Sequence, residues 1–374
     1  MVAGTLDDFG IYVHIPFCAA RCDYCAFATW TDRDHLMAAY VEACVAELRA
    51  ARADEGLPPA TSVYVGGGTP SRLPAQLLAE LLGAVVRTAD AEVTVECNPE
   101  DATEALLATW RSAGATRVSF GVQSLVPAVL EGLGRRHDPA AAARAVARAG
   151  AAGFEAISVD LIFGGAGESD DDFRCSLDGV LDLEPSPGHI SAYALTVEPG
   201  TPLAADRARH PDDDVQARRY VLADAVLSAA GYEWYEVSNW ARPGHSCRHN
   251  RLYWQQGDYR GIGAAAHSHR RGRRWWNIRT PERYIAAVTA GMPTMAGEEV
   301  LSPQQVEFER LALALRTSTG VPASVVPIDV DLAALFERRG AQMVLTTEGR
   351  LLANEITTRL VPSESSEAPT ILRP

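Results

Sequence analysis

The first thing this sequence lacks is a long hydrophobic run, since no stretch approaches the roughly 18 apolar residues that span a bilayer. It also lacks the features of a secretory signal, because the segment before Phe9 carries Asp7 and Asp8 and no basic region followed by an apolar core. Its seven cysteines are too few and too scattered for a secreted disulfide framework. We therefore expect a soluble, cytoplasmic protein that does not span a membrane.

Positive charge is also scarce. The formal net charge is -14, and basic residues cluster only between Arg270 and Arg274. This balance argues against nucleic-acid binding. The chain of 374 residues exceeds the size at which a single core stops growing, about 250 to 300 residues. We expect one large domain with a smaller appendage.

Three of the cysteines share one short loop. Cys18, Cys22 and Cys25 have the spacing C-x3-C-x2-C and directly follow the apolar run Ile11–Phe17. A [4Fe-4S] cluster normally takes four thiolates, so three would leave one iron open to an exchangeable ligand. Structural zinc is the alternative, although it requires four closed ligands and usually pairs two such elements at a distance.

Short apolar runs alternate with longer amphipathic stretches along the first two thirds of the chain. The predicted strands are Ile11–Phe17, Ser62–Val65, Glu92–Cys97, Arg117–Val122, Ala156–Phe163 and Ile190–Val197. The predicted helices are His35–Ala53, Pro74–Thr88, Thr103–Ala113, Pro139–Ala152, Asp170–Leu183 and Asp212–Ala230. Repeated alternation indicates an α/β fold with a parallel sheet. Periodicity does not separate an open doubly wound sheet from a barrel.

The composition changes after Gly231. We divide the chain into a core over 1–231, an aromatic-rich region over 232–300, a small C-terminal α/β domain over 301–362 and a tail over 363–374. The small domain alternates helical and strand-like pieces and is also compatible with a winged helix, but the acidic balance argues against DNA binding. The tail is rich in Ser, Glu and Pro, so we expect it to be disordered.

Polar residues stand at the ends of most predicted strands. The second strand runs into the turn Gly66–Pro70, and Glu96, Gln123 and Asp160 end or interrupt later strands. Ligands collect at the carboxyl ends of strands in strand-helix barrels. A carboxylate in an apolar strand is costly unless it is paired. Pairing with an arginine such as Arg117, and an ordinary tight turn for the glycines, are the structural alternatives.

The segment Tyr12–Cys25, with its string YVHIPFC, resembles the radical S-adenosylmethionine (SAM) superfamily. Within it, the chain is similar to oxygen-independent coproporphyrinogen III oxidases and to HemW-type heme chaperones over most of its length. This resemblance implies an incomplete (β/α)6 barrel with a small C-terminal α/β domain. It also implies a [4Fe-4S] cluster on Cys18, Cys22 and Cys25 and SAM at the open iron. The implied SAM-binding residues are Tyr12, Gly67, Gly68, Thr69, Glu96, Gln123, Arg135 and Asp160.

Two departures favour the chaperones within this group. The oxidases carry a further cysteine two residues after the third, and Phe27 stands there in this chain. The string His249-Asn250-Arg251-Leu252-Tyr253-Trp254 matches the H-N-x-x-Y-W pattern of the chaperones. An imidazole beside aromatic rings suits heme, because imidazole ligates heme iron.

The resemblance therefore favours a heme site at His249, Tyr253 and Trp254. His267, further along the same region, is the reserve candidate for the iron ligand. The alternative is structural: His249 makes a hydrogen bond to a loop, and the side chains of Tyr253 and Trp254 pack in the hydrophobic core. We expect His14, inside the first strand, to be a packed structural histidine.

The resulting hypothesis is a chaperone that binds the cluster, SAM and heme and passes heme to acceptor proteins, some of which are membrane proteins. The family resemblance also allows a homodimer. The rival is a coproporphyrinogen III oxidase that uses a 5'-deoxyadenosyl radical to decarboxylate propionate side chains. A zinc-stabilised scaffold without catalytic activity is the third hypothesis.

Overall fold

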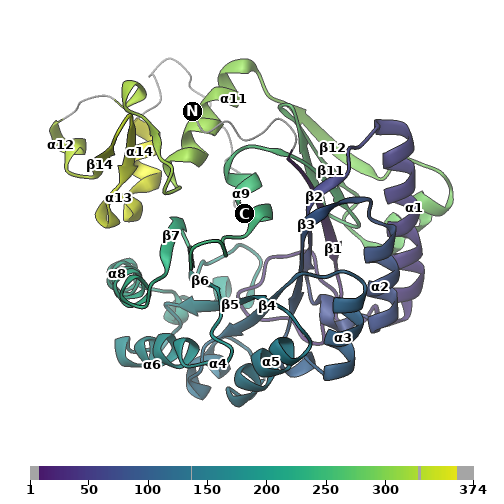
Figure 1. The fold of residues 1–374 in the computed structure, drawn as a ribbon, viewed down its shortest axis with the longest axis horizontal. Helices are drawn as coiled ribbons and strands as arrows, with labels where there is room; N and C mark the ends of the chain where they lie inside the picture. Colours follow the sequence, from purple (N-terminus) through teal and green to yellow (C-terminus); the bar gives the residue numbers. More distant parts are fainter. Residues whose placement is uncertain (1–7, 136, 327–329, 360–374) are drawn as a thin grey trace.

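The computed structural model describes residues 8–135, 137–326 and 330–359. Its centre is a curved sheet of parallel strands with helices along the convex side (Figure 1). The parallel strands are β1 (Phe9–Ile15), β2 (Ala60–Gly67), β3 (Arg87–Cys97), β4 (Arg117–Gln123), β5 (Ala156–Phe163) and β6 (His189–Ala194). The helices that cover them are α1 (Met37–Glu55), α2 (Ala75–Ala84), α3 (Glu104–Ser112), α4 (Pro127–Gly132), α5 (Ala140–Ala151), α6 (Asp170–Leu181), α7 (Pro202–Ala205) and α8 (Asp213–Ala229).

The predicted α/β fold with an incomplete barrel is confirmed. β1 pairs with β9 (Asp258–Ile262) on the side away from β2, so the sheet does not close onto β6. The strands form where apolar residues run nearly without interruption, as in β5, which is buried except at Ala156 and Asp160. Such runs are typical of parallel strands covered on both faces.

The predicted helix over 74–88 is wrong at its end, because α2 stops at Ala84 and β3 has already begun at Arg87. Arg87 lies opposite Ala60 in the sheet. Its guanidinium donates to the carbonyls of Leu82 and Ala113, which ties the strand to the ends of two helices. Tertiary contacts thus override the helical pattern at this point.

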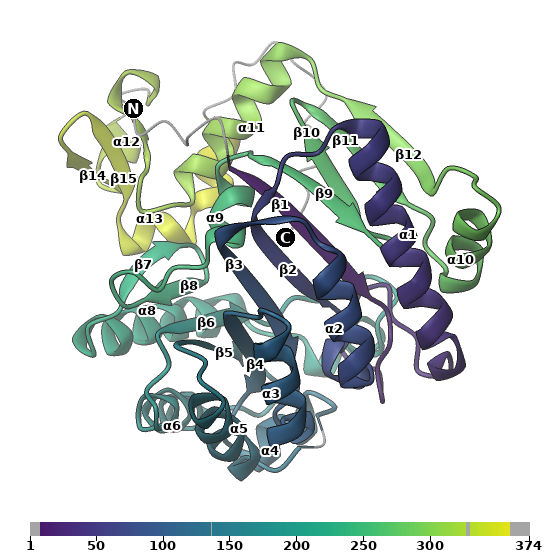
Figure 2. The same cartoon turned by 45° about the vertical axis from the view of Figure 1, so that its right-hand side comes forward.

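The region 232–300 adds strands to both edges of the sheet. Next to β1 lie β9, β10 (His267–Arg270), β11 (Arg273–Asn277) and β12 (Met295–Val300), and next to β6 lie β8 (Asn239–Ala241) and β7 (Glu233–Glu236). Figure 2 shows β10, β11 and β12 continuing the sheet beyond α1. Two helices come from the same region, α9 (Arg248–Trp254) and α10 (Pro281–Thr289). The sequence analysis did not predict α9, which is only seven residues long.

The predicted small C-terminal α/β domain is also confirmed. It contains α11 (Pro303–Leu315), β13 (Val321–Pro322), α12 (Val330–Ala333), β14 (Phe336–Arg339), β15 (Gln342–Leu345), α13 (Thr347–Leu351) and α14 (Ala353–Arg359). Its three strands form a separate sheet in the order β13-β15-β14. The predicted disordered tail over 363–374 lies outside the described residues. No helix in the described ranges is long and apolar enough to cross a membrane.

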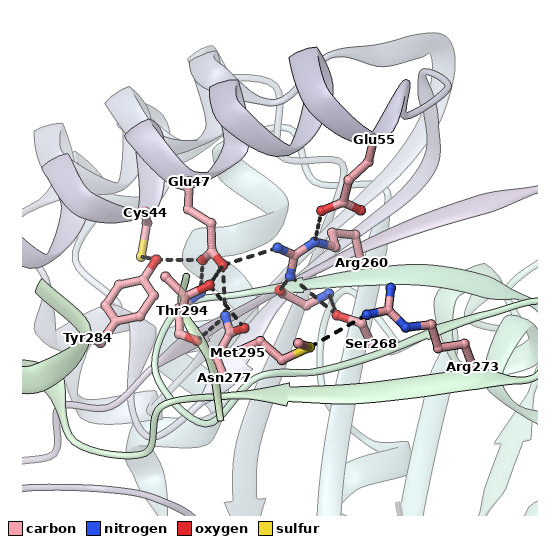
Figure 3. A network of polar contacts seen from close by, with 12 residues as sticks. Cys44, Glu47, Glu55, Arg260, Ser268, Arg273, Asn277, Tyr284, Thr294 and Met295 are labelled. Carbon is pink, nitrogen blue, oxygen red and sulfur yellow. Dashed lines mark hydrogen bonds and ion pairs between the residues drawn. The ribbon is translucent and has the colours of Figure 1, made fainter. Parts of the chain in front are cut away.

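A buried polar network fastens the added strands to α1 (Figure 3). Its centre is the Glu47 carboxylate, 5 % exposed, which lies 3.2 Å from the Arg260 guanidinium. Further donors to Glu47 are Asn277 Nδ2 at 2.9 Å, Thr294 Oγ1 at 2.7 Å, Tyr284 Oη at 2.6 Å and the Gly263 amide at 3.0 Å. This arrangement satisfies a buried charge with one cation and several hydrogen bonds, as a low-polarity interior requires.

We predict that Glu47→Ala lowers the free energy of unfolding by about 3 to 5 kcal/mol, because it leaves Arg260 buried beside unpaired donors. Glu55→Ala is the matched control: Glu55 also pairs with Arg260, at 3.1 Å, but is 31% exposed. Its loss should stay below about 1 kcal/mol. Urea denaturation followed by circular dichroism measures both, and equal losses would contradict the central role of Glu47.

Candidate functional site

The carboxyl ends of β1, β2 and β3 bring three side chains to one wall of the barrel. Tyr12 and Tyr64 lie opposite each other in the register, with their rings stacked at 6.4 Å. Tyr64 Oη donates to Glu96 Oε1 at 2.8 Å, and the amide of Gly67 donates to Glu96 Oε2 at 3.1 Å. Glu96 therefore has both oxygens bonded to neutral donors.

A second carboxylate stands further along the same wall. Asp160 accepts from Ser191 Oγ at 2.7 Å and from Ser119 Oγ at 3.1 Å. In the described part of the chain, neither Glu96 nor Asp160 has an ion-pair partner. Arg117, the cation that the sequence suggested as an alternative partner, pairs with Glu92 at 3.1 Å.

The pKa values of both carboxyl groups are raised, and no cation among the described residues offsets the effect of burial. Burial raises the pKa of Glu96 to about 7, and the nearby Asp160 carboxylate adds to the increase. Burial also raises the pKa of Asp160. Two carboxylates on one wall without a cation partner suit a ligand with positive charge and hydroxyl donors.

The three-cysteine loop leaves the end of β1 and returns beside it. The Cys18 amide donates to the carbonyl of Trp30 at 3.0 Å, and the Trp30 amide donates to the carbonyl of Pro16 at 2.8 Å. Cys18, Cys22 and Cys25 are free thiols with partial exposure. The described residues contain no group of three His, Cys, Asp or Glu side chains placed to hold a single metal ion. A cubane instead distributes its thiolates over separate irons.

Neighbouring side chains reach two of these sulfurs. Thr69 Oγ1 lies 3.5 Å from Cys18 Sγ, and the Arg135 guanidinium lies 3.7 Å from Cys22 Sγ. Burial raises the pKa of the Cys18 and Cys25 thiols, so bound metal or nearby donors are needed to favour their thiolates. The Thr69 hydroxyl at Cys18 acts in that direction.

The glycine turn after β2 packs directly on the cysteine loop. The Gly68 amide donates to the carbonyl of Ile15 at 2.7 Å, and the Thr69 amide donates to the carbonyl of Phe17 at 2.8 Å. A Cβ on Gly67, whose φ is +107°, would come within 2.3 Å of His14 Nδ1, and one on Gly68 would lie 3.1 Å from Cys18 Sγ. The amides of this turn are therefore used in hydrogen bonds within the protein.

Gln123 and Arg135 end the wall on the β4 side. Gln123 has a φ of 65°, at a register shift in the β4–β5 pairing, and its Oε1 is buried without a hydrogen-bond partner in the described structure. Arg135 donates to Asn98 Oδ1 at 2.9 Å and to the carbonyl of Gly121 at 3.1 Å. Gln123 thus combines a strained backbone with an unpaired buried oxygen, and its role in SAM binding stays a prediction.

His14 is the packed histidine that the sequence predicted. Its ring bridges Tyr12 Oη at 3.0 Å and the carbonyl of Ala28, in the cysteine loop, at 2.9 Å. Burial lowers the pKa of His14 to about 4, so the ring is neutral at physiological pH. The residues that sequence reasoning missed are Tyr64, Ser119 and Ser191, which hold the two carboxylates. Their only sequence signal was a polar side chain at an inward strand position.

The predicted heme residues lie on α9, against the inner side of β1 and β2. His249 is 1% exposed, and its ring nitrogens lie 2.9 Å from Ser62 Oγ and 2.9 Å from Tyr253 Oη. Burial lowers its pKa to about 3. Trp254 Nε1 is buried with no partner in the described ranges. Iron coordination by His249 would require the loss of one of its hydrogen bonds, so its heme role stays a prediction.

Comparisons with known proteins agree with this geometry. Residues 12–178 match the radical SAM superfamily. The chain is 44% identical to the heme chaperone HemW of Mycobacterium tuberculosis (strain CDC 1551 / Oshkosh), covering 94% of this chain and 95% of that protein. It is 32% identical to the heme chaperone HemW of Bacillus subtilis (strain 168), covering 92% and 97%.

Among solved structures, the coproporphyrinogen III oxidase HemN of Escherichia coli matches with a TM-score of 0.81, covering 95% of this chain and 90% of that one. The two are 22% identical, so this likeness concerns the fold alone. The two bacterial relatives are more similar in sequence and extend over nearly the whole chain. The protein belongs to the HemW family of the radical SAM superfamily.

Proposed function

We propose that this protein is a heme chaperone that binds a [4Fe-4S] cluster, SAM and heme and passes heme to acceptor proteins. The observation that carries the proposal is the cysteine loop beside a pocket with two cation-free carboxylates, in a chain whose relatives are named heme chaperones. The loop supplies thiolates, and neither Glu96 nor Asp160 has a cation partner in the described residues. SAM, with its sulfonium and ammonium groups, would provide positive charge to them.

Cys18, Cys22 and Cys25 would hold the cluster, because they are free thiols in one loop and two of them have a hydroxyl or guanidinium partner. The cluster, when bound, supplies an iron with no protein thiolate from this loop. The protein's own contribution is positioning: His14 and the Gly68 amide fix the loop against β1 and β2.

We predict that Cys22→Ser abolishes the cluster, since a hydroxyl does not replace the thiolate beside Arg135. Anaerobic reconstitution of the wild type should give about four irons and four sulfides per chain. Cys175→Ser is the control, because Cys175 is an exposed thiol on α6. Iron and sulfide analysis with the brown visible absorbance measures all three. Zinc without sulfide in the wild type would instead favour the scaffold hypothesis.

The SAM pocket should respond to pH through Glu96. Its pKa of about 7 means that much of it is protonated below neutral pH, whereas a cationic ligand favours the ionised form. SAM affinity of the cluster-loaded protein should therefore rise about tenfold from pH 6 to pH 8, with proton release on binding near pH 7. Anaerobic calorimetry in two buffers of different ionisation enthalpy measures both effects.

Glu96→Gln should bind SAM more weakly and without this pH dependence, because no proton can leave the amide. Glu104→Gln, on the exposed surface of α3, is the matched control and should retain the wild-type profile. A pH dependence that persists in Glu96→Gln would assign the titration to another group.

The coproporphyrinogen III oxidase hypothesis is the second candidate, because the same cysteine loop and SAM-binding residues would serve both functions. This chain differs from the oxidases at Phe27, whose side chain is 57% exposed and does not pack in the core. Its side chain is therefore free to influence what approaches the cysteine loop, where the oxidases carry a cysteine.

The decisive experiment gives the cluster-loaded protein hemin in one assay and coproporphyrinogen III, SAM and a reductant in another. We expect a Soret band with hemin and no protoporphyrinogen, since the proposed cargo is the finished heme. The absorbance spectrum and chromatography of the porphyrins measure the two outcomes. Decarboxylation of coproporphyrinogen would replace the chaperone by the oxidase, and absence of hemin binding would reject the chaperone.

A further inference from the structure

The turn after β9 lies beside the start of the cysteine loop. β9 runs parallel to β1, with Ile262 opposite Val13, so the residues after both strands emerge together. Tyr40 Oη joins them, because it donates to the carbonyl of His14 at 2.8 Å and accepts from the Ala264 amide at 2.7 Å. His267 follows this turn as the first residue of β10.

His267 forms an exposed aromatic pair with Trp276. The two residues are opposite each other on β10 and β11, and their rings stack at 5.8 Å with an interplanar angle of 29°. Trp276 is 37% exposed, and His267 is also exposed. On the next strand Gly297 leaves room for the indole, since a Cβ there would lie 2.6 Å from Trp276 Cζ2. A flat aromatic surface therefore faces solvent at this edge.

The ring nitrogens of His267 distinguish it from the other histidines nearby. His14, His249 and His269 all use ring nitrogens in hydrogen bonds to the protein. Within the described ranges, neither ring nitrogen of His267 makes a hydrogen bond, and the ring stacks on Trp276. Desolvation and the positive charge of Arg274 lower the pKa of His267, which keeps the ring neutral and its lone pair available at physiological pH.

The Glu47 network holds both members of the pair in place. Glu47 accepts from the Gly263 amide at 3.0 Å and from Asn277 Nδ2 at 2.9 Å, and Asn277 also donates to the carbonyl of Gly263 at 2.9 Å. Figure 3 shows Glu47 and Asn277 meeting beneath α1. Gly263 begins the turn before His267, and Asn277 directly follows Trp276. The network thus fixes the two strands that present the rings.

We propose that His267 is the axial ligand of heme iron and that Trp276, stacked on the imidazole, holds that ring in place. This inference rests on the proposed heme-chaperone function. It places the cargo at the exposed edge by β10 and β11, next to the cysteine loop, and it assigns His249 a structural role in the inner wall. An exposed imidazole needs no broken hydrogen bond to reach iron, whereas His249 would lose one of two. Aromatic faces and imidazole nitrogen are the groups that suit a metalloporphyrin.

The test is an anaerobic hemin titration of the full chain, read by Soret position, apparent Kd and the ferric electron paramagnetic resonance spectrum. His267→Ala should weaken binding by about tenfold or more and remove the imidazole-ligated signature, which added free imidazole should restore. Trp276→Leu should weaken binding and retain that signature. His35→Ala is the matched control, because His35 is an exposed histidine near the start of α1, and it should bind like the wild type.

His249→Gln separates the two candidate ligands. We expect it to retain the imidazole signature, since glutamine can keep hydrogen bonds to Ser62 and Tyr253. The inference is overturned if His267→Ala leaves the spectrum unchanged while His249→Gln removes the signature. Failure of the wild type itself to bind hemin would instead reject the proposed function, so the two failures are distinguishable.

Discussion

Two buried carboxylates without a cation impose the main constraint on this molecule. Glu96 and Asp160 stand on neighbouring parts of one wall, and the fold compensates for their burial with neutral donors from Tyr64, Ser119 and Ser191. Neutral donors satisfy the oxygens but leave the negative charge uncompensated. The strand register, which sets Ser191 opposite Asp160 and brings Tyr64 and Ser119 within hydrogen-bond distance of the carboxylates from neighbouring strands, is therefore as important to the site as the carboxylates themselves.

The cysteine loop depends on the same strands. His14 connects Tyr12 on the wall with the carbonyl of Ala28 in the loop, and the glycine turn closes from the β2 side. A larger residue at Gly67 would displace His14, and one at Gly68 would press on Cys18. The wall that carries Tyr12 and the cysteine loop are thus joined by one set of contacts.

The parallel strands and the cysteine loop could be predicted from the sequence, whereas several residues of the site could not. The apolar runs of the six parallel strands were visible, and Asp160 stood out as a carboxylate inside one of them. The three cysteines were identified by spacing alone. Tyr64 was not identified, because its role depends on the distance to Glu96 across two strands. The environment of His249 was equally hidden, since Ser62 reaches it from a strand far away in the sequence.

β12 is an edge strand of the large sheet, with only β11 as its neighbour in the described structure. Glu298 and Glu299 on this strand pair with Arg273 and Arg274 of β11, each at 2.7 Å. Charged side chains along a terminal strand discourage another sheet from adding to it. An unclosed sheet presents unpaired backbone groups at its last strand, and here the ion pairs between β12 and β11 disfavour the addition of another strand. The sheet can therefore stay open without polymerising through its own backbone.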